Sequence, residues 1–263
     1  MKNSEIKALA KARMKANQTT IILIVILTSL ISLLQNGELL FLNIISIILS
    51  PFITYVIAKL SLYNHENLSL SDAYKNFNFK YWLKVFVANL IIGIPSFIFW
   101  IVFTSLLLGL GMSFVLPSTG LIDDAMMITI FGGTIFVIIL LVIIQLVVSI
   151  LLELFFGLSK FIALDNEELN IIQTLKKSFN LMKGHKKELF FLELSFILWF
   201  LGIGILNYVM LYIPFINIFT TIITGILSAY VIVYIDFSVG EFYKHITCKE
   251  DIFNHETIEV EII

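Results

Sequence analysis

Three carboxylates stand out because each interrupts a long apolar run of the sequence: Glu153, Glu193 and Asp236. A carboxylate at the centre of a bilayer costs roughly 2.5–3.5 kcal/mol even on the mildest insertion scale, so it needs a compensating partner. The membrane topology expected below puts all three near the cytoplasmic ends of their spans, where they could meet in one cavity. Such a cavity would bind a cation, carry a proton or hold an amine headgroup.

Each carboxylate also has a simpler interpretation, which we favour. It would reach the interface or pair with a nearby base such as Lys59, Lys84 or Lys160. Gln145 lies in the middle of another apolar run. For this amide, an interhelical hydrogen bond worth about 0.6–2 kcal/mol is favoured over contact with a substrate. The three carboxylates and this glutamine form the candidate intramembrane polar site.

Recognised catalytic patterns are missing from the sequence. It contains no phosphate-binding loop, no His-Glu-x-x-His and no Gly-x-Ser-x-Gly. Its four histidines are widely spaced, and its one cysteine, Cys248, excludes an internal disulfide and any multi-cysteine metal site. We therefore expect no catalytic residues, no metal and no cofactor. An intramembrane enzyme is the least favoured class, because no pair of nucleophile and base is visible.

Six lysines on two amphipathic segments, 3–16 and 165–183, form a second candidate site. They are Lys7, Lys11, Lys15, Lys176, Lys177 and Lys183. The first three recur every four residues and so share one stripe of a helix, and the others lie off the apolar face of theirs. On an anionic inner leaflet each basic residue contributes roughly 1 kcal/mol. We expect contact with lipid headgroups or a membrane protein partner, and not with nucleic acid, because no nucleic-acid-binding motif accompanies these lysines.

Composition indicates that these segments belong to a membrane protein. Of 263 residues, 59% are hydrophobic and 14% are charged, and the mean hydropathy is +0.99. A soluble domain averages about 45–50% apolar and about 25% charged residues, so lipid must form part of the solvent. Six apolar runs are each near or above the ~20 residues that a bilayer core requires. We place them at 17–35, 39–62, 83–110, 126–158, 189–213 and 215–239.

The charges of the loops set the expected orientation. Of the 17 Lys and Arg residues, five precede the first run, four lie in or beside the loop after the second, six between the fourth and fifth, and two after the sixth. The alternate loops, at 36–38, 111–125 and around Pro214, contain none. The positive-inside rule therefore puts both termini in the cytoplasm. No small-residue cleavage site follows the first run, so we expect an uncleaved anchor.

A cytoplasmic amphipathic segment precedes each pair of apolar runs, at 3–16, about 69–81 and 165–183. In the third segment, Asp165 and Glu168 are spaced as a capping box at the helix start, and Gly184 is placed to end the helix. Ile171, Ile172, Leu175, Phe179 and Met182 would form its apolar face. This pattern predicts a helix on the membrane surface that feeds a helix crossing the membrane.

The expected fold is all-α. One six-span membrane domain, 1–246, would consist of three hairpins of transmembrane helices, each preceded by a cytoplasmic amphipathic helix. An acidic cytoplasmic tail, 247–263, would follow. For this tail, a frayed and solvated chain is favoured over a strand added to a partner's sheet.

Several segments resemble a known family. They are the stretch from Glu5 to Asn17, the segment from Phe190 to Gly202 with its Leu-Ser-Phe-x-x-Trp motif, Pro214, and Glu241-Phe-Tyr-Lys244. Together they resemble a bacterial family of predicted integral membrane proteins, the domain of unknown function nine-seven-five, over nearly the whole chain. The chain departs from that pattern in its acidic tail and at Ala16, where glycine is expected. The family is distantly similar to the membrane region of some bacterial glycerophosphodiester phosphodiesterases, which implies a non-catalytic module.

The resemblance carries no activity over, so the functional hypothesis rests on the residues. We favour a non-enzymatic module of the bacterial plasma membrane that acts as a scaffold, regulates a partner or engages lipid through its basic cytoplasmic surface. The alternative is a small transporter or channel component that uses the intramembrane carboxylates.

Overall fold

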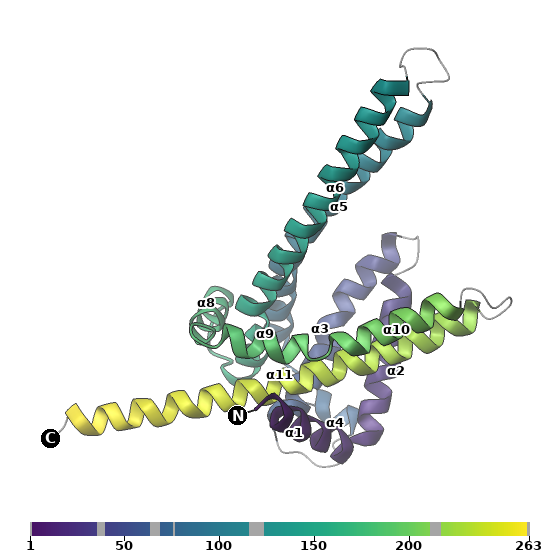
Figure 1. Cartoon of the computed structure of the whole chain (residues 1–263). Coiled ribbons are helices and arrows are strands. Elements are labelled where there is room, and N and C mark those ends of the chain that lie inside the picture. The colour runs from purple at the N-terminus through teal and green to yellow at the C-terminus, as the bar shows by residue number, and fades with distance from the viewer. Residues whose placement is uncertain are drawn as a thin grey trace. The chain divides into compact units, whose positions relative to one another are not determined.

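The computed structural model describes the backbone of residues 2–35, 40–63, 69–75, 77–115, 124–210 and 217–261. Every regular element in these ranges is a helix (Figure 1). The chain divides into two compact units. Unit 1 comprises Met1–Val87 and Gly157–Ile263, and unit 2 comprises Ala88–Phe156.

The helices of the described ranges are as follows in chain order. They are α1 (Asn3–Ala16), α2 (Gln18–Gln35), α3 (Leu40–Leu62), α4 (Leu70–Tyr74), α5 (Phe79–Val115), α6 (Asp124–Phe156), α7 (Ser159–Asp165), α8 (Ile171–Leu181), α9 (Lys186–Leu194), α10 (Ile197–Met210) and α11 (Asn217–Glu261). The protein is therefore all-helical over these ranges, as the sequence predicts.

Five helical stretches within the described residues are long and apolar enough to cross a membrane. They are Ile44–Leu62, Phe79–Gly109, Gly132–Asp165, Lys186–Met210 and Phe219–Cys248. A sixth span is added when α1 and α2, which meet at an angle of 98°, are counted as one broken span. These stretches coincide with the apolar runs of the sequence. The chain is thus a helical protein with five or six candidate membrane spans.

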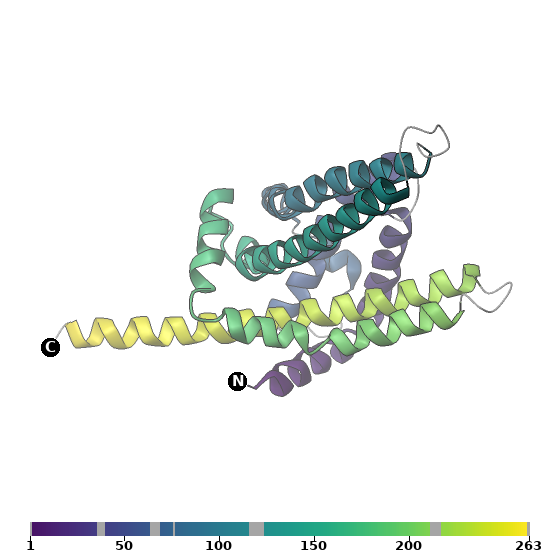
Figure 2. The same cartoon turned by 45° about the horizontal axis from the view of Figure 1, so that its top comes forward.

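In unit 1, α11 is the helix around which the others assemble. It packs against α1, α2, α3, α9 and α10, and its course beside α10 is visible in both Figure 1 and Figure 2. Phe237, Phe242 and Tyr243 of α11 are almost fully buried. The Tyr243 ring stacks on Phe161 of α7 at 5.9 Å between centroids. Large buried side chains of this kind dominate the energetics of a core.

The first helix has the predicted bounds but a different environment. Its residues Ile6, Ala10 and Met14, spaced by four, are buried, so this face packs against the protein. Leu9 is 46% exposed. The bend after α1 occurs at Asn17, whose side-chain amide donates back to the Arg13 carbonyl at 3.3 Å. The Asn17 backbone N–H donates to the same carbonyl at 3.2 Å, so Asn17 closes the last turn of α1 with two contacts.

The predicted start of the third amphipathic helix is wrong. Asp165 ends α7, and α8 begins after Asn170, which forms the capping box with Gln173. The Asn170 side chain accepts from the Gln173 N–H at 2.8 Å, and the Gln173 side chain accepts from the Asn170 N–H at 2.9 Å. Asp165 instead accepts a hydrogen bond from Tyr243 at 3.0 Å. The helix ends at Leu181, two residues before the predicted end at 183, and Gly184 follows in the turn at φ +94°, which favours glycine.

Two further segments differ from the expectation. The segment 69–81 is not one amphipathic helix, because the short helix α4 ends at Tyr74 and α5 begins at Phe79. Asn78 starts α5 by accepting a hydrogen bond from the Lys80 N–H at 2.9 Å, which is the usual action of asparagine before a helix. The second segment is the expected tail, 247–263. In it α11 continues to Glu261, so the backbone up to that residue is helical rather than frayed or extended.

Unit 2 consists of α6 and the part of α5 that follows Val87. The two helices run side by side in Figures 1 and 2. Their large apolar side chains are mostly exposed; Phe97 is 67% exposed, Trp100 60% and Phe136 68%. An apolar surface of this extent is typical of helices surrounded by lipid.

Candidate functional site

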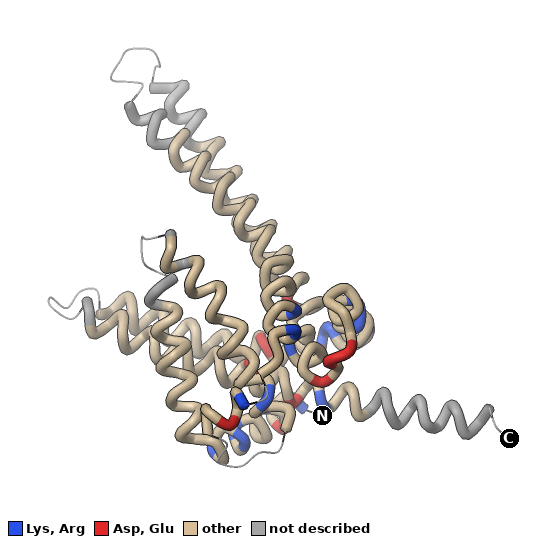
Figure 3. The backbone as a smooth tube through the Cα atoms, turned by 180° about the vertical axis from the view of Figure 1, so that it is seen from behind, with Lys and Arg blue, Asp and Glu red and all other residues tan. Residues whose placement is uncertain are grey.

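Most charged residues of unit 1 gather at one end of the unit (Figure 3). Lysines, acidic residues and the single arginine of α1, α4, α7 and α8 lie there, whereas the apolar lengths of α2, α3 and α10 extend away from them. Because hydrocarbon excludes charge, this separation is typical of a bundle with one end at a membrane surface. Both candidate sites predicted from the sequence contain charged residues of unit 1.

Asp236 is paired inside unit 1. Its carboxylate forms an ion pair with Lys160 of α7, and the two side chains are 18% and 19% exposed. This is the arrangement that the simpler interpretation describes. Tyr81 of α5 is buried in the same unit. Its hydroxyl is buried and, among the described residues, has no hydrogen-bond partner.

The other members of the intramembrane site lie in different places. Glu193 is in α9 of unit 1 with a half-buried side chain, whereas Glu153 is in α6 of unit 2. A cavity shared by all three carboxylates therefore stays a prediction. Gln145 of α6 donates to Ser96 of α5 at 2.8 Å, which is the interhelical hydrogen bond that the sequence analysis favours. In the part of the chain that the structure describes, no three His, Cys, Asp or Glu side chains are grouped to hold a metal ion.

Lys7 contacts residues of three helices. The helix breaks between α9 and α10, where the Trp199 N–H donates to the Phe196 carbonyl at 2.9 Å instead of to the Ser195 carbonyl, four residues back. Lys7 donates to the Ser195 carbonyl at 3.2 Å and lies 4.2 Å from the centre of the Phe196 ring. Tyr234 of α11 donates to the Lys7 carbonyl at 3.1 Å. Burial lowers the pKa of the Lys7 ammonium below its usual value.

Arg13 of α1 forms a second junction, which was not predicted from the sequence. The guanidinium donates to the carbonyls of Ser61 at 2.9 Å and Tyr63 at 3.4 Å, so it caps the end of α3. It also forms an ion pair with Glu241 of α11, whose side chain is only 6% exposed. Lys244 contacts the same carboxylate at 2.8 Å. The signal available in the sequence was Glu241, an acidic residue just after the last apolar run, together with the basic residues of the N-terminal segment.

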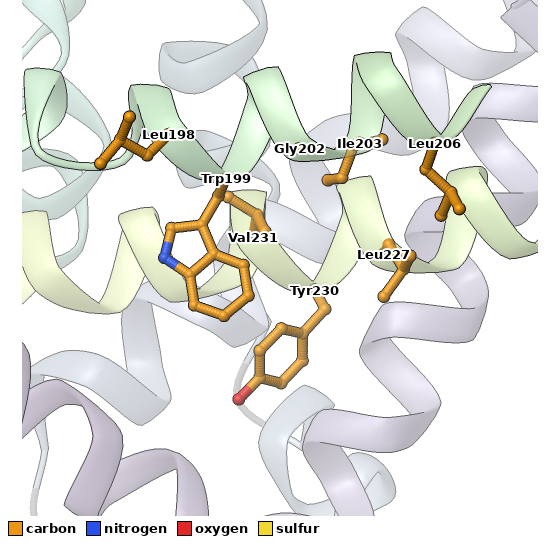
Figure 4. Close-up of a pocket in the computed structure, with 8 residues that line it drawn as sticks. All are labelled: Leu198, Trp199, Gly202, Ile203, Leu206, Leu227, Tyr230 and Val231. Carbon is orange, nitrogen blue, oxygen red and sulfur yellow. The ribbon is translucent and has the colours of Figure 1, made fainter. Parts of the chain in front are cut away.

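The other two lysines of the stripe on α1 lie beside a groove. Lys11 and Lys15 line one end of a groove of about 690 Å³ between α1, α2 and α11. A second, apolar pocket of about 300 Å³ lies between α10 and α11. Figure 4 shows that the rings of Trp199 and Tyr230 project to the same side of this helix pair. Tyr230 and Leu227 line both spaces, so the groove and the pocket adjoin.

The lysines of α8 lie on or beside an exposed surface. Lys176 and Lys177 line a shallow depression of about 330 Å³, and Lys177 also donates to Asn166 at 3.1 Å. Lys183 lies 5.4 Å from the centre of the Phe179 ring. Lysine over an aromatic face is a weakly attractive contact that leaves the ammonium accessible. Lys176 and Lys177 therefore present positive charge on α8, and Lys183 does so two residues beyond its end.

Residues 1–250 match a family described as "Protein of unknown function (DUF975)". The chain belongs to the DUF975 family. Neither a curated protein nor a solved structure matches it. The family resemblance seen in the sequence is confirmed, whereas the similarity to the membrane region of glycerophosphodiester phosphodiesterases stays a prediction.

The structure gives the segments that carry the DUF975 resemblance a common role. The N-terminal segment supplies Lys7 and Arg13, the Leu-Ser-Phe-x-x-Trp motif supplies the broken helix at Ser195, and the last segment supplies Glu241 and Lys244. These segments, far apart in the chain, meet at the two junctions. The segments that carry the DUF975 resemblance thus supply the contacts that hold α1 against the other helices of unit 1.

Proposed function

We propose that this DUF975 protein is a non-enzymatic module of the bacterial plasma membrane, a scaffold, regulator or lipid-engaging protein. Its spans would form three hairpins with both termini in the cytoplasm, and its basic cytoplasmic surface would be the contact area. The proposal rests above all on α8, which exposes lysines and large apolar side chains together.

The burial pattern of α8 supports this role. The helix packs through Thr174, Ser178 and Leu181, which are buried. Of the predicted apolar face, Met182 is buried and Ile171 and Leu175 are half-buried, but Ile172 is 76% exposed and Phe179 37% exposed. Most amphipathic helices of soluble proteins bury this face. A helix that exposes large apolar side chains beside lysines is suited to an anionic membrane surface or to an acidic partner.

The segment before α8 is held in place, which supports a preformed contact surface. Lys84 is 6% exposed and donates to the carbonyls of Asn166 at 3.2 Å and Glu167 at 2.9 Å. Lys177 donates to the Asn166 side chain from within α8. Fixing the ends of a binding element before contact lowers the entropic cost of binding.

The test is native mass spectrometry of the protein extracted gently from its own membrane. We expect a stoichiometric partner protein or anionic lipid on the wild type, and its loss in the variant Lys176→Glu/Lys183→Glu. Lys177 is left unchanged because of its contact with Asn166. The matched control, Lys75→Glu/Lys80→Glu, reverses two exposed charges outside α8 and should keep the bound species. A bare wild-type chain, or equal loss in both variants, would contradict the proposal.

The proposed orientation can be tested with the natural cysteine. Cys248 is the single cysteine of the chain and is exposed, near the end of the last candidate span. A maleimide that does not cross membranes should label it at least ten-fold faster in inverted vesicles than in right-side-out vesicles. The Cys248→Ser variant gives the background. Faster labelling in right-side-out vesicles would place the C-terminus outside.

Transport is the second candidate function, and the pair Asp236–Lys160 is the observation in its favour. Both residues lie within candidate spans, and a charged pair at such a position is typical of ion and proton pathways. Under this hypothesis Glu193→Gln or Asp236→Asn would abolish ion or proton flux in reconstituted vesicles at unchanged protein content. Under the scaffold proposal neither amide variant changes the species bound to α8.

A further inference from the structure

The groove between α1, α2 and α11 combines two chemistries at its two ends. Lys11, Lys15 and Gln18 line one end, where α1 turns into α2. The remainder is apolar and is lined by α2 from Ile21 to Ile26 and by α11 from Ile226 to Tyr230. Because α1 and α2 meet at 98°, the basic end lies along α1 and the apolar part follows α2.

The groove is closed on one side and open on the other. Met14, Ile21 and Val25 form its floor and are 5%, 4% and 6% exposed. Ile22 and Tyr230 form its rim and are 52% and 41% exposed. From Gln18 to Ile26, α2 rises by about 12 Å, at about 1.5 Å per residue. The apolar part is therefore long enough for several methylene groups in a row.

The lysine stripe of α1 favours an anionic ligand in the groove. Lys7 is engaged with Ser195 and Phe196, whereas among the described residues neither Lys11 nor Lys15 forms an ion pair. Two exposed ammonium groups at the mouth of an apolar groove attract an anion that carries a hydrocarbon chain. The volume of about 690 Å³ lies within the ~300–1,000 Å³ typical of pockets for small molecules.

We propose that this groove binds one anionic phospholipid of the cytoplasmic leaflet. Its phosphate would contact Lys11 and Lys15, and one acyl chain would lie between Ile22 of α2 and Tyr230 of α11. The inference rests on the membrane orientation proposed above, because that orientation puts α1 at the headgroup level. It uses a different surface from α8, so the two proposals can fail separately.

The experiment is native mass spectrometry of the full chain, purified in detergent and stripped of lipid, during titration with dioleoylphosphatidylglycerol or dioleoylphosphatidylcholine. We expect one tightly bound phosphatidylglycerol per chain and much weaker phosphatidylcholine. Lys11→Gln/Lys15→Gln should weaken phosphatidylglycerol about 25-fold, at about five-fold for each lysine. It should leave phosphatidylcholine unchanged.

Two further variants test whether lipid binding depends on the groove or on the overall positive charge. Lys75→Gln/Lys80→Gln removes the same charge from two exposed positions outside both the groove and α8, and should leave phosphatidylglycerol binding unchanged. Ile22→Trp fills the rim without changing the charge and should weaken phosphatidylglycerol at least ten-fold. All four substituted lysines and Ile22 are exposed, so the fold should survive, which the elution volume of each variant checks.

Three outcomes would overturn the inference. Equal losses in the two lysine pairs would show attraction to charge in general, and the function proposed above would still stand. Equal affinity for phosphatidylglycerol and phosphatidylcholine would show that Lys11 and Lys15 do not select an anionic lipid. A dimer that Ile22→Trp abolishes would assign the groove to a second copy of the chain.

Discussion

Arg13→Met should destabilise unit 1 by about 3 kcal/mol, near the lower end of the range for breaking a buried ion pair. The change removes the strongest cation beside Glu241, a carboxylate that is 6% exposed. It also removes the donor to the Ser61 carbonyl at the end of α3. Lys244 still contacts Glu241 at 2.8 Å and limits the loss. Thermal unfolding of the detergent-solubilised protein measures the effect.

A double-mutant cycle separates the ion pair from other effects of the substitution. Arg13→Met/Glu241→Leu should be more stable than Arg13→Met, because it leaves no buried charge without its main partner. Lys15→Met, on an exposed position of the same helix, should change stability by less than about 0.5 kcal/mol. Strict additivity of Arg13→Met and Glu241→Leu would show that the pair carries no coupling energy.

The positions of the spans were predictable because the signal is local. A run of about 20 apolar residues has one stable placement in a bilayer, whatever its neighbours are. Each candidate span of the structure lies at a run identified in the sequence, and the bend after α1 falls beside Asn17, where the first run begins. No knowledge of tertiary packing was needed for either feature.

The partners of the charged side chains were not predictable in the same way. Lys7, Lys11 and Lys15 share one stripe of α1, yet Lys7 bonds to the broken helix at Ser195 and the other two line a groove. Helical periodicity gives the face of a residue but not the helix opposite it. The same limit applies to Arg13, whose partner Glu241 lies more than two hundred residues away in sequence.

The capping box shows how two local signals of similar strength can compete. Asp165 and Glu168 have the spacing of a helix start, but so do Asn170 and Gln173. In the structure the second pair is used, and the Asp165 carboxylate accepts from Tyr243 of α11. A contact with a distant helix therefore decided between the two, and the sequence near Asp165 contains no trace of that contact.

Gly240→Ala is the second substitution with a large expected effect. A Cβ at this position would lie 2.5 Å from the Ser61 Oγ, 2.7 Å from the Ser61 Cβ and 3.2 Å from the Phe161 ring. Both neighbours are fully buried, and the Ser61 hydroxyl donates to the Ala58 carbonyl at 2.9 Å, so neither can move freely. We expect a loss of about 3 kcal/mol, the upper end for overpacking, because α3 and α11 must separate.

The cause of that loss can be tested with a compensating variant and a matched control. Ser61→Gly removes the two closest atoms, so Gly240→Ala/Ser61→Gly should regain much of the stability lost by Gly240→Ala. Gly225→Ala, on the same helix, has nothing within 4 Å of its new Cβ and should be neutral or stabilising by up to about 1 kcal/mol, since alanine favours a helix. If both alanine variants have the same melting temperature, α3 and α11 do not approach closely at Gly240. The Arg13 contact with the Ser61 carbonyl, which depends on the same approach, would then also need to be revised.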